Sequence, residues 1–311
     1  MIYDTFGRPL NSLRIQVNAS CNFKCFFCHM EGTDENGSML TPEMIERVVK
    51  IAASNGVNRV KFTGGEPLLR KDMEEIISRT RKHVSGDISL TTNAFFLKER
   101  ANSLKNAGLN RINISMHSIE EEKFETITGV RALDRVREGI SAAKAAGLEP
   151  VKVNFVVLRE LNEDQIGRMM RFCAEQDAIL QLIEYETDRQ GERSEIYQKY
   201  HYDLRPLEDH LSRMAEGIET NSLHNRKRFQ IRIEDGRVAK VEIVRPQRNA
   251  DFCNHCTRLR VTSKGEFQTC LNRRDQLFPF SDLDDIGIGK AFENAVLARV
   301  PYWREADENS Y

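Results

Sequence analysis

Short runs of aliphatic and β-branched residues alternate with longer stretches in which apolar residues recur every three or four positions, up to about residue 185. We predict strands at the short runs, which span 13–17, 57–62, 88–92, 111–115, 151–158 and 179–183. The amphipathic stretches between them are typical of helices. Strand and helix therefore alternate repeatedly, which predicts an α/β fold with a parallel sheet and right-handed crossovers.

Two of the predicted helices have marked limits. The first follows the N-cap residue Thr41, has Pro42 at its first position and ends at Gly56. The second ends at Gly147, after an apolar stripe formed by Leu133, Val136, Ile140 and Ala143. Cys173 falls on a third apolar stripe, with Ile166, Met169 and Met170, and we expect it to be a buried, inert thiol.

Reactive and polar residues fall at the ends of several predicted strands. This placement favours a partial (β/α)6 TIM-type barrel over a doubly wound sheet, because a barrel builds its site at those ends. Beyond residue 185 come a polar stretch at 188–202 and two hairpins, with strands at 229–233 and 238–244, and at 258–262 and 266–270. We therefore expect a smaller C-terminal α+β region, and divide the chain into domains 1–228 and 229–311.

Charge and composition narrow the classes of function. The 46 Lys and Arg against 47 Asp and Glu leave a net charge of −1, so no overall field attracts nucleic acid or an acidic membrane. We expect no signal peptide and no membrane span, because no apolar run has the required length or position. Seven cysteines in such a chain favour the reducing cytoplasm and metal ligation over disulfides.

Cys21, Cys25 and Cys28 form the most specific motif, C-x3-C-x2-C, directly after the first predicted strand. Three thiolates can hold an iron–sulfur cluster by three corners, which leaves one iron open to another ligand. A structural zinc site would require a fourth ligand, and this segment does not fit its usual spacing. The simplest alternative is a loop with three incidental thiols, but free cysteines rarely cluster so closely.

A second triad lies far downstream, with Cys253 and Cys256 as C-x2-C and Cys270 on the other side of a predicted hairpin. A second cluster with an open iron is one interpretation. A zinc site is the other, and His255 is its nearest fourth ligand.

Arg258 and Arg260 follow this triad one strand period apart, so both lie on one face of the strand. Paired guanidinium groups beside a metal site suit phosphate or carboxylate recognition, although such arginines can also form an ordinary solvated face.

Thr63-Gly64-Gly65-Glu66-Pro67 follows the second predicted strand, and its glycines allow a ligand to approach the backbone. After the first cysteine triad, this segment resembles the radical S-adenosylmethionine (SAM) superfamily. The order of the motifs, including segments 91–93, 111–115 and 151–154 and the second triad, resembles the GTP 3′,8-cyclase family (molybdenum cofactor biosynthesis protein A) over nearly the whole chain.

The resemblance implies two 4Fe–4S clusters, one at each triad, with SAM on the first and the guanine of GTP on the second. In that family a 5′-deoxyadenosyl radical takes a hydrogen atom from C3′ of GTP, and 3′,8-cyclo-7,8-dihydro-GTP forms. The implied partners are GTP, an external electron donor and a downstream cyclic pyranopterin synthase, with the enzyme a monomer or homodimer. Nucleic acid and membranes are not expected partners.

Matched positions carry the family's site residues over to this chain. The SAM contacts fall on Phe27, Gly65 and Ser115, with Glu66 close by. The GTP contacts fall on Arg14, Lys61, Thr91, Lys152, Arg258, Leu259 and Arg260. Arg258 and Arg260 are also the predicted catalytic residues.

The chain departs from the family pattern at several places. Phe27 stands where the family usually has Tyr, and Gln181 and Glu186 stand where bacterial members have Arg and Met. The last printed residues, 308–311, are not the Gly-Gly of bacterial and animal members, which resembles an archaeal type.

Two alternatives remain at this stage. One is a radical SAM maturase that acts on a peptide and uses the second cluster for electron transfer. The other is a non-catalytic zinc-binding module, which leaves the first triad and the glycine pair unexplained.

Overall fold

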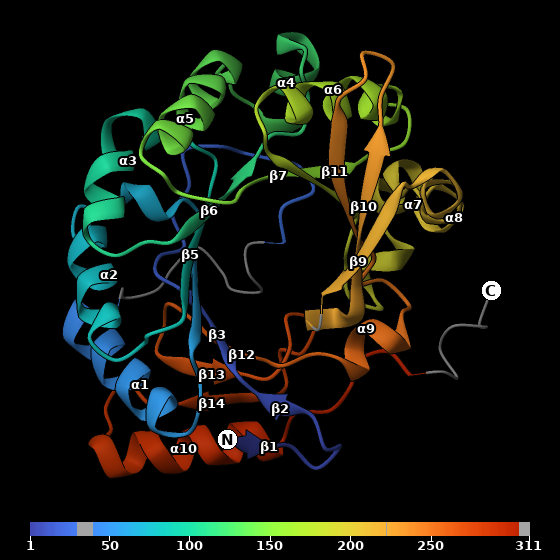
Figure 1. Cartoon of the computed structure of the whole chain (residues 1–311). Helices are drawn as coiled ribbons and strands as arrows, with labels where there is room; N and C mark the ends of the chain where they lie inside the picture. The colour runs from blue at the N-terminus through green and yellow to red at the C-terminus, as the bar shows by residue number, and fades with distance from the viewer. Residues whose placement is uncertain (30–39, 222, 305–311) are drawn as a thin grey trace.

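One curved sheet extends through the whole molecule (Figure 1). The structure is a computed structural model, and it describes residues 1–29, 40–221 and 223–304. Within these ranges the sheet has 12 strands in the order β14-β13-β12-β3-β4-β5-β6-β7-β8-β11-β10-β9. A separate two-stranded sheet pairs β1 (Ile2–Tyr3) with β2 (Pro9–Leu10).

The six strands predicted for the N-terminal part are all present, adjacent and parallel, which confirms the partial barrel. They are β3 (Ser12–Gln16), β4 (Arg59–Thr63), β5 (Asp87–Thr92), β6 (Arg111–Ser115), β7 (Val151–Val157) and β8 (Ile179–Glu184). The helices between them are α1 (Pro42–Ser54), α2 (Met73–Arg81), α3 (Leu97–Asn106), α4 (Glu121–Thr128), α5 (Leu133–Ala145) and α6 (Ile166–Glu175). Helices α1, α2, α3 and α5 pack side by side outside the sheet (Figure 1).

The helix signals in the sequence act as predicted. The Thr41 hydroxyl accepts a hydrogen bond from the backbone N–H of Met44 at 3.2 Å, and Pro42 is the first residue of α1. The predicted stripe of α5 is buried. On α6, Met169, Met170 and Cys173 are buried, Ile166 is partly buried, and Cys173 has no exposed surface. Burial raises the pKa of the Cys173 thiol, which keeps it protonated and unreactive as expected.

The C-terminal part extends the sheet at both edges, which the sequence did not indicate. Strand β12 (Arg258–Val261) pairs parallel with β3, and β11 (Val238–Val244) pairs parallel with β8. Each belongs to a predicted hairpin: β12 pairs with β13 (Glu266–Gln268), and β11 pairs with β10 (Arg226–Arg232). The outermost strands are β14 (Leu277–Pro279) and β9 (Gly217–Asn221).

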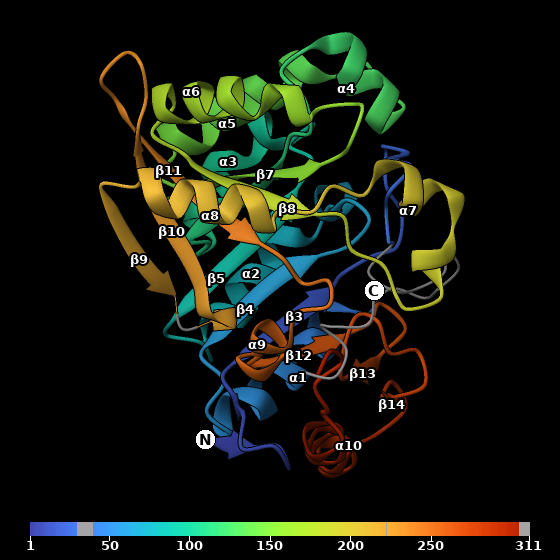
Figure 2. The ribbon, with the colours of Figure 1, turned by 90° about the vertical axis from the view of Figure 1, so that its right-hand side faces the viewer.

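The remaining helices lie beside this extension. Helix α8 (Arg205–Met214) lies against β10, and α10 (Asp285–Leu297) lies against α1, β13 and β14 (Figure 2). The two short helices are α7 (Glu195–Tyr200) and α9 (Ala250–Asn254). The predicted division at 228/229 falls inside β10, and strands from both sides of it share one sheet. That division stays a prediction.

The two faces of the sheet have opposite chemistry. On the outer face, Phe62, Leu90, Ile112 and Val153 are completely buried beneath the helices. Each such side chain contributes roughly 1.5–3 kcal/mol of hydrophobic stabilisation. The alternate residues face inward, and many of them are polar or charged, so the concave face is free to form a polar site. None of the helices in the described ranges has the length and apolar character that a membrane span requires.

Candidate active site

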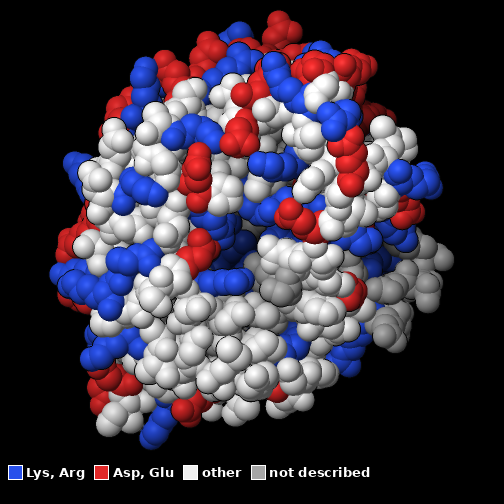
Figure 3. All heavy atoms as spheres, in the orientation of Figure 1, with Lys and Arg blue, Asp and Glu red and all other residues white. Residues whose placement is uncertain are grey.

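The inner face of the curved sheet lines a cavity of about 650 Å³. Strand register aligns five inward-facing residues across five neighbouring strands: Arg260, Arg14, Lys61, Ser89 and Arg111. We call this set the basic row. The surface view shows Lys and Arg side chains gathered around the hollow on this face of the molecule (Figure 3). The cavity is therefore suited to an anionic ligand.

The cations of this cavity raise one another's electrostatic energy. Burial lowers the pKa of Lys61 well below its usual value, and the nearby charges of Arg111 and Arg14 lower it further. Burial and the same kind of repulsion lower the pKa of Arg258. Within the described part of the chain, neither side chain has a hydrogen bond or an ion pair. Half-buried cations without a carboxylate partner are costly unless a ligand supplies the negative charge.

The first cysteine triad lies on the loop that follows β3. Backbone bonds from Lys24 to Thr128 at 2.8 Å and from Cys28 to Cys25 at 3.0 Å hold the loop. Cys21 and Cys28 are exposed, and Cys25 is half-buried. Burial, together with charge repulsion from the other two thiols, raises the pKa of Cys25 to about 12. Three thiols this close, all at the cavity, fit the donor set of an iron–sulfur cluster, whose iron would remove that repulsion.

The glycine pair packs directly beneath this loop. The N–H of Gly65 donates to the Asn18 carbonyl at 3.0 Å, and the N–H of Glu66 donates to the Ser20 carbonyl at 2.8 Å. A Cβ on Gly65 would lie 2.2 Å from the Ser20 carbonyl oxygen, and one on Gly64 would lie 2.1 Å from Oδ1 of Asn18. Glycine is required here because the two loops touch through their backbones.

The side chain of Glu66 lies under the same loop rather than in the cavity lining. It accepts hydrogen bonds from the Thr92 hydroxyl and the Asn93 N–H, both at 2.7 Å, and from the Leu68 N–H at 2.9 Å. Burial outweighs these bonds and raises its pKa to about 7. Glu66 therefore ties the glycine segment to the end of β5.

The second triad faces the same cavity as the first. Burial raises the pKa of Cys253 to about 12 and that of Cys270 to about 11. Burial also acts to raise the pKa of Cys256, but the positive charges of Arg258 and Arg299 outweigh it and lower that pKa. Of the three thiols in the second triad, Cys256 is therefore the one that most readily becomes a thiolate, the form that binds metal.

The zinc alternative requires a fourth ligand beside the second triad, and His255 was the nearest candidate. The His255 ring Nδ1 lies 2.9 Å from the Asp251 carbonyl and 3.1 Å from the Asp251 carboxylate, so this side is turned toward α9. Across residues 1–29, 40–221 and 223–304, no three His, Cys, Asp or Glu side chains converge on a single-ion site.

Most of the predicted site residues line the cavity together. This holds for Phe27, Gly65, Thr91, Ser115, Arg14, Lys61, Lys152, Arg258, Arg260 and all six cysteines. Leu259 faces the opposite way and is fully buried in the core. The two positions that depart from the bacterial pattern, Gln181 and Glu186, also line the cavity. Residues 308–311 lie outside the described residues.

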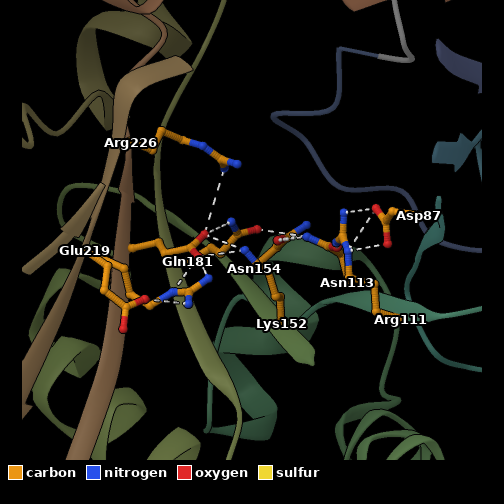
Figure 4. A network of polar contacts seen from close by, with 10 residues as sticks. Asp87, Arg111, Asn113, Lys152, Asn154, Gln181, Glu219 and Arg226 are labelled. Carbon is orange, nitrogen blue, oxygen red and sulfur yellow. Dashed lines mark hydrogen bonds and ion pairs between the residues drawn. The ribbon is translucent and has the colours of Figure 1, made fainter. Parts of the chain in front are cut away.

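Gln181 belongs to a second line of side chains, which the register aligns as Arg228, Glu242, Gln181, Asn154 and Ser115. We call it the acid–amide row. The Gln181 amide donates to Glu242, and its oxygen accepts a hydrogen bond from Asn113 at 2.8 Å. Figure 4 shows this network continuing through Asn113 and Arg111 to Asp87. Gln181 therefore connects a buried carboxylate to the end of the basic row.

Several cavity residues escaped the sequence analysis. Arg226 and Arg228 line the cavity but precede the predicted strand at 229–233, and no motif marked them. Glu242, which pairs with Arg228 behind the lining, lies inside the predicted strand at 238–244 and was not marked either. His117 also lines the cavity, 4.9 Å from the Phe27 ring, and burial lowers its pKa to about 4. Its Nδ1 accepts a hydrogen bond from the Val156 N–H, so the ring is neutral. The position of His117, two residues beyond a predicted strand end, was the available signal.

Comparison with known proteins agrees with this architecture. The family model described as radical SAM superfamily matches residues 15–173, and the one described as molybdenum cofactor synthesis C matches residues 178–296. Among solved structures, Streptococcus suis SuiB bound to S-adenosylmethionine has a TM-score of 0.65 at 19% identity, over 89% of this chain and 64% of that chain. The enzyme anSMEcpe with bound AdoMet has a TM-score of 0.61 at 19% identity, over 92% and 82%. These two likenesses concern the fold.

The fold, the first triad and these matches define a radical SAM protein with a molybdenum cofactor synthesis C-terminal region. Relatives named probable GTP 3′,8-cyclase cover nearly the whole chain. The protein of Thermoplasma volcanium is 57% identical over 99% of this chain and 94% of its own length. The protein of Pyrococcus horikoshii is 44% identical over 97% and 98%. The chain belongs to the GTP 3′,8-cyclase family.

Replacement of Gly65 by Ala is expected to displace the first cysteine loop, because no space exists for the added Cβ. We expect loss of most of the iron held by the first triad and a fall of roughly 1–3 kcal/mol in the free energy of unfolding. Iron analysis and denaturant titration measure both. Gly167→Ala on α6 is the matched control, because its Cβ would meet no atom within 4 Å. Equal iron in both variants would contradict the packing role.

Proposed function

We propose that the chain is a radical SAM GTP 3′,8-cyclase that forms 3′,8-cyclo-7,8-dihydro-GTP for molybdenum cofactor biosynthesis. The observation that carries the proposal is the single cavity shared by both cysteine triads and by two half-buried cations, Lys61 and Arg258, which have no carboxylate partner among the described residues. An anionic nucleotide between two metal centres satisfies both features. The relatives named probable GTP 3′,8-cyclase identify that nucleotide as GTP.

A SAM cofactor and an iron–sulfur cluster come with the superfamily, and we propose two 4Fe–4S clusters. Cys21, Cys25 and Cys28 would hold the first, and Cys253, Cys256 and Cys270 the second. When bound, the first cluster and SAM supply the 5′-deoxyadenosyl radical that abstracts hydrogen from C3′ of GTP. The protein supplies position, since both triads line the cavity of the curved sheet.

Around the first triad, Phe27, Gly65 and Ser115 would contact SAM. Gly65 brings the backbone to the cavity wall, and Ser115 ends β6 with its side chain on the acid–amide row. Glu66 acts from beneath by fixing the glycine segment against Asn93.

GTP would lie along the basic row. Its guanine would lie beside the second triad, where Arg258 and Arg260 of β12 donate hydrogen bonds to the base and stabilise charge during the reaction. Leu259 between them would hold the segment by its core packing. Arg14, Lys61 and Lys152 would neutralise the phosphates, and Thr91 lies on the same wall.

Other features of the proposal follow from the family. The radical step needs an external electron donor, and the product would pass to a cyclic pyranopterin synthase. We propose domains 1–228 and 229–311, a monomer or homodimer, and a cytoplasmic location, which reduced thiols such as those present here require. A peptide maturase is not favoured, because the relatives that match nearly the whole chain bear the cyclase name.

The reaction itself is the decisive test. Incubation of the anaerobically purified protein with dithionite, SAM and GTP should give 5′-deoxyadenosine and a cyclised nucleotide. GTP deuterated at C3′ should transfer deuterium to 5′-deoxyadenosine, because hydrogen is taken from that carbon. If 5′-deoxyadenosine forms independently of GTP and no cyclised nucleotide appears, the proposed function is wrong.

Replacement of one cysteine in either triad by Ser should remove about half of the bound iron, because each triad would hold one of two equal clusters. Iron and sulfide analysis with the visible spectrum measures the loss. Cys173→Ser is the control and should retain all the iron, because Cys173 is buried in α6. Zinc instead of iron at the second triad would contradict the two-cluster proposal.

The affinity for GTP should fall as the pH rises past about 8. Burial and neighbouring cations lower the pKa of Lys152 to about 8, despite its ion pair with Glu242. A bound phosphate would raise this pKa again, so binding takes up a proton above pH 8 and weakens with each further rise. Titration of GTP from about pH 7 to 9 measures the slope. Lys152→Met should flatten it, and an unchanged slope would assign the effect to another group.

A further inference from the structure

Three cations of the cavity wall, from two strands, meet one carboxylate that is buried behind them. Both oxygens of Glu242 lie 2.7 Å from Nζ of Lys152, and its Oε1 also accepts hydrogen bonds from Arg228 at 2.7 and 3.0 Å. Nη1 of Arg226 lies 4.0 Å from Oε2. Glu242 is 2% exposed, so water does little to screen these interactions.

Glu242 is fixed from its other side as well. The Gln181 amide donates to Oε2, and Gln181 is itself held by Asn113 at 2.8 Å. Burial acts to raise the pKa of Glu242, but the charges of Lys152 and Arg226 outweigh it and lower that pKa to about 2. The carboxylate is therefore ionised at neutral pH and orients the cations around it.

Glu242 does not balance these cations. Arg228 makes a second ion pair, with Glu219 at 3.0 Å, so among the described ion pairs Lys152, Arg226 and Arg228 share the two carboxylates Glu242 and Glu219. Arg226 is nearly buried, and burial with the charges of Arg111 and Arg228 lowers its pKa. All three cations line the cavity. Their positive charge is thus held at a place that a ligand can reach.

The direction of Arg226 is visible in Figure 4, where its guanidinium extends from β10 toward the network formed by Gln181 and Lys152. Arg226 and Arg228 alternate on one face of β10, so both project from the same strand to the same wall. A guanidinium can bind two phosphate oxygens at once, whereas the ammonium of Lys152 is a point charge. Together they offer a charged cradle with defined geometry.

We propose that Arg226 and Arg228, oriented by Glu242, form with Lys152 a subsite for the terminal phosphates of the nucleotide. This inference rests on the proposed function and extends it. The second triad and Arg258 lie on β12 and its flanks, and Lys152 and Glu242 lie across the sheet on β7 and β11. A nucleotide with its base at β12 therefore has its phosphates within reach of this cradle. The subsite makes the cavity selective for a triphosphate over a monophosphate.

Nucleotide binding by the cluster-loaded full chain tests this subsite. Calorimetry under anaerobic conditions would measure dissociation constants for GTP, GMP, ATP and inorganic tripolyphosphate. Arg226→Gln should raise the constants for GTP and tripolyphosphate about tenfold, the scale of one lost charge-assisted contact, and change that for GMP less than about twofold. Arg228→Gln should act in the same direction and serves if Arg226→Gln fails to fold.

Arg232→Gln is the matched control. Arg232 lies on the same strand, but its side chain is exposed and pairs with Glu216 at 2.9 Å. This variant should bind every ligand as the wild type does. Unchanged tripolyphosphate binding in both Arg226→Gln and Arg228→Gln, or an equal loss for GTP and GMP, would overturn the subsite. Equal affinity of the wild type for GTP and ATP would instead count against the proposed function, and the tripolyphosphate result would still decide the subsite.

Discussion

Repulsion among the cations of the cavity wall is the constraint on which the rest of the site depends. The concave face carries Arg14, Lys61, Arg111 and Arg260 side by side, because strand register aligns alternate inward positions. In a closed hydrophobic core such a row would be prohibitively costly. Here the hydrophobic stabilisation comes from the opposite face of the same strands, so the inner face can retain unfavourable charge for a ligand to neutralise.

The protein limits this repulsion with a few anions of its own. Asp87 pairs with Arg111 at 2.6 Å, and Glu242 pairs with Lys152. The side chains of Arg111 and Lys152 are therefore oriented before any ligand enters. Lys61 and Arg258 have no such partner among the described residues. The difference divides the cations into two kinds: those that are positioned by carboxylates, and those whose charge only a ligand or a metal centre can balance. Preorganisation of the first kind lowers the cost of binding.

Sequence patterns predicted the barrel strands and both triads because their signals are local: a period of two, a cysteine spacing, a glycine pair. They did not indicate that β11 and β12 would join opposite edges of one sheet, since pairing between distant segments has no local signature. Arg226 and Arg228 were missed for a related reason, because the predicted hairpin strand began at residue 229, three residues after Arg226 and one after Arg228. Leu259 is the opposite case: its place in the motif predicted a GTP contact, but its side chain is buried in the core.

Position 181 carries a neutral glutamine, and cations on neighbouring strands can compensate for the charge that it lacks. From the sequence alone, Gln181 means one cation fewer than the resemblance to bacterial members implies, and in isolation that weakens phosphate binding. Register places Gln181 next to Glu242, and Glu242 next to Arg228. An arginine at position 181 would need Glu242 as its counter-ion, whereas a glutamine donates one hydrogen bond to it and leaves its charge to Lys152 and Arg228. In this chain the cations Arg226 and Arg228 lie on β10, two strands along the sheet from Gln181 on β8, and they line the same cavity.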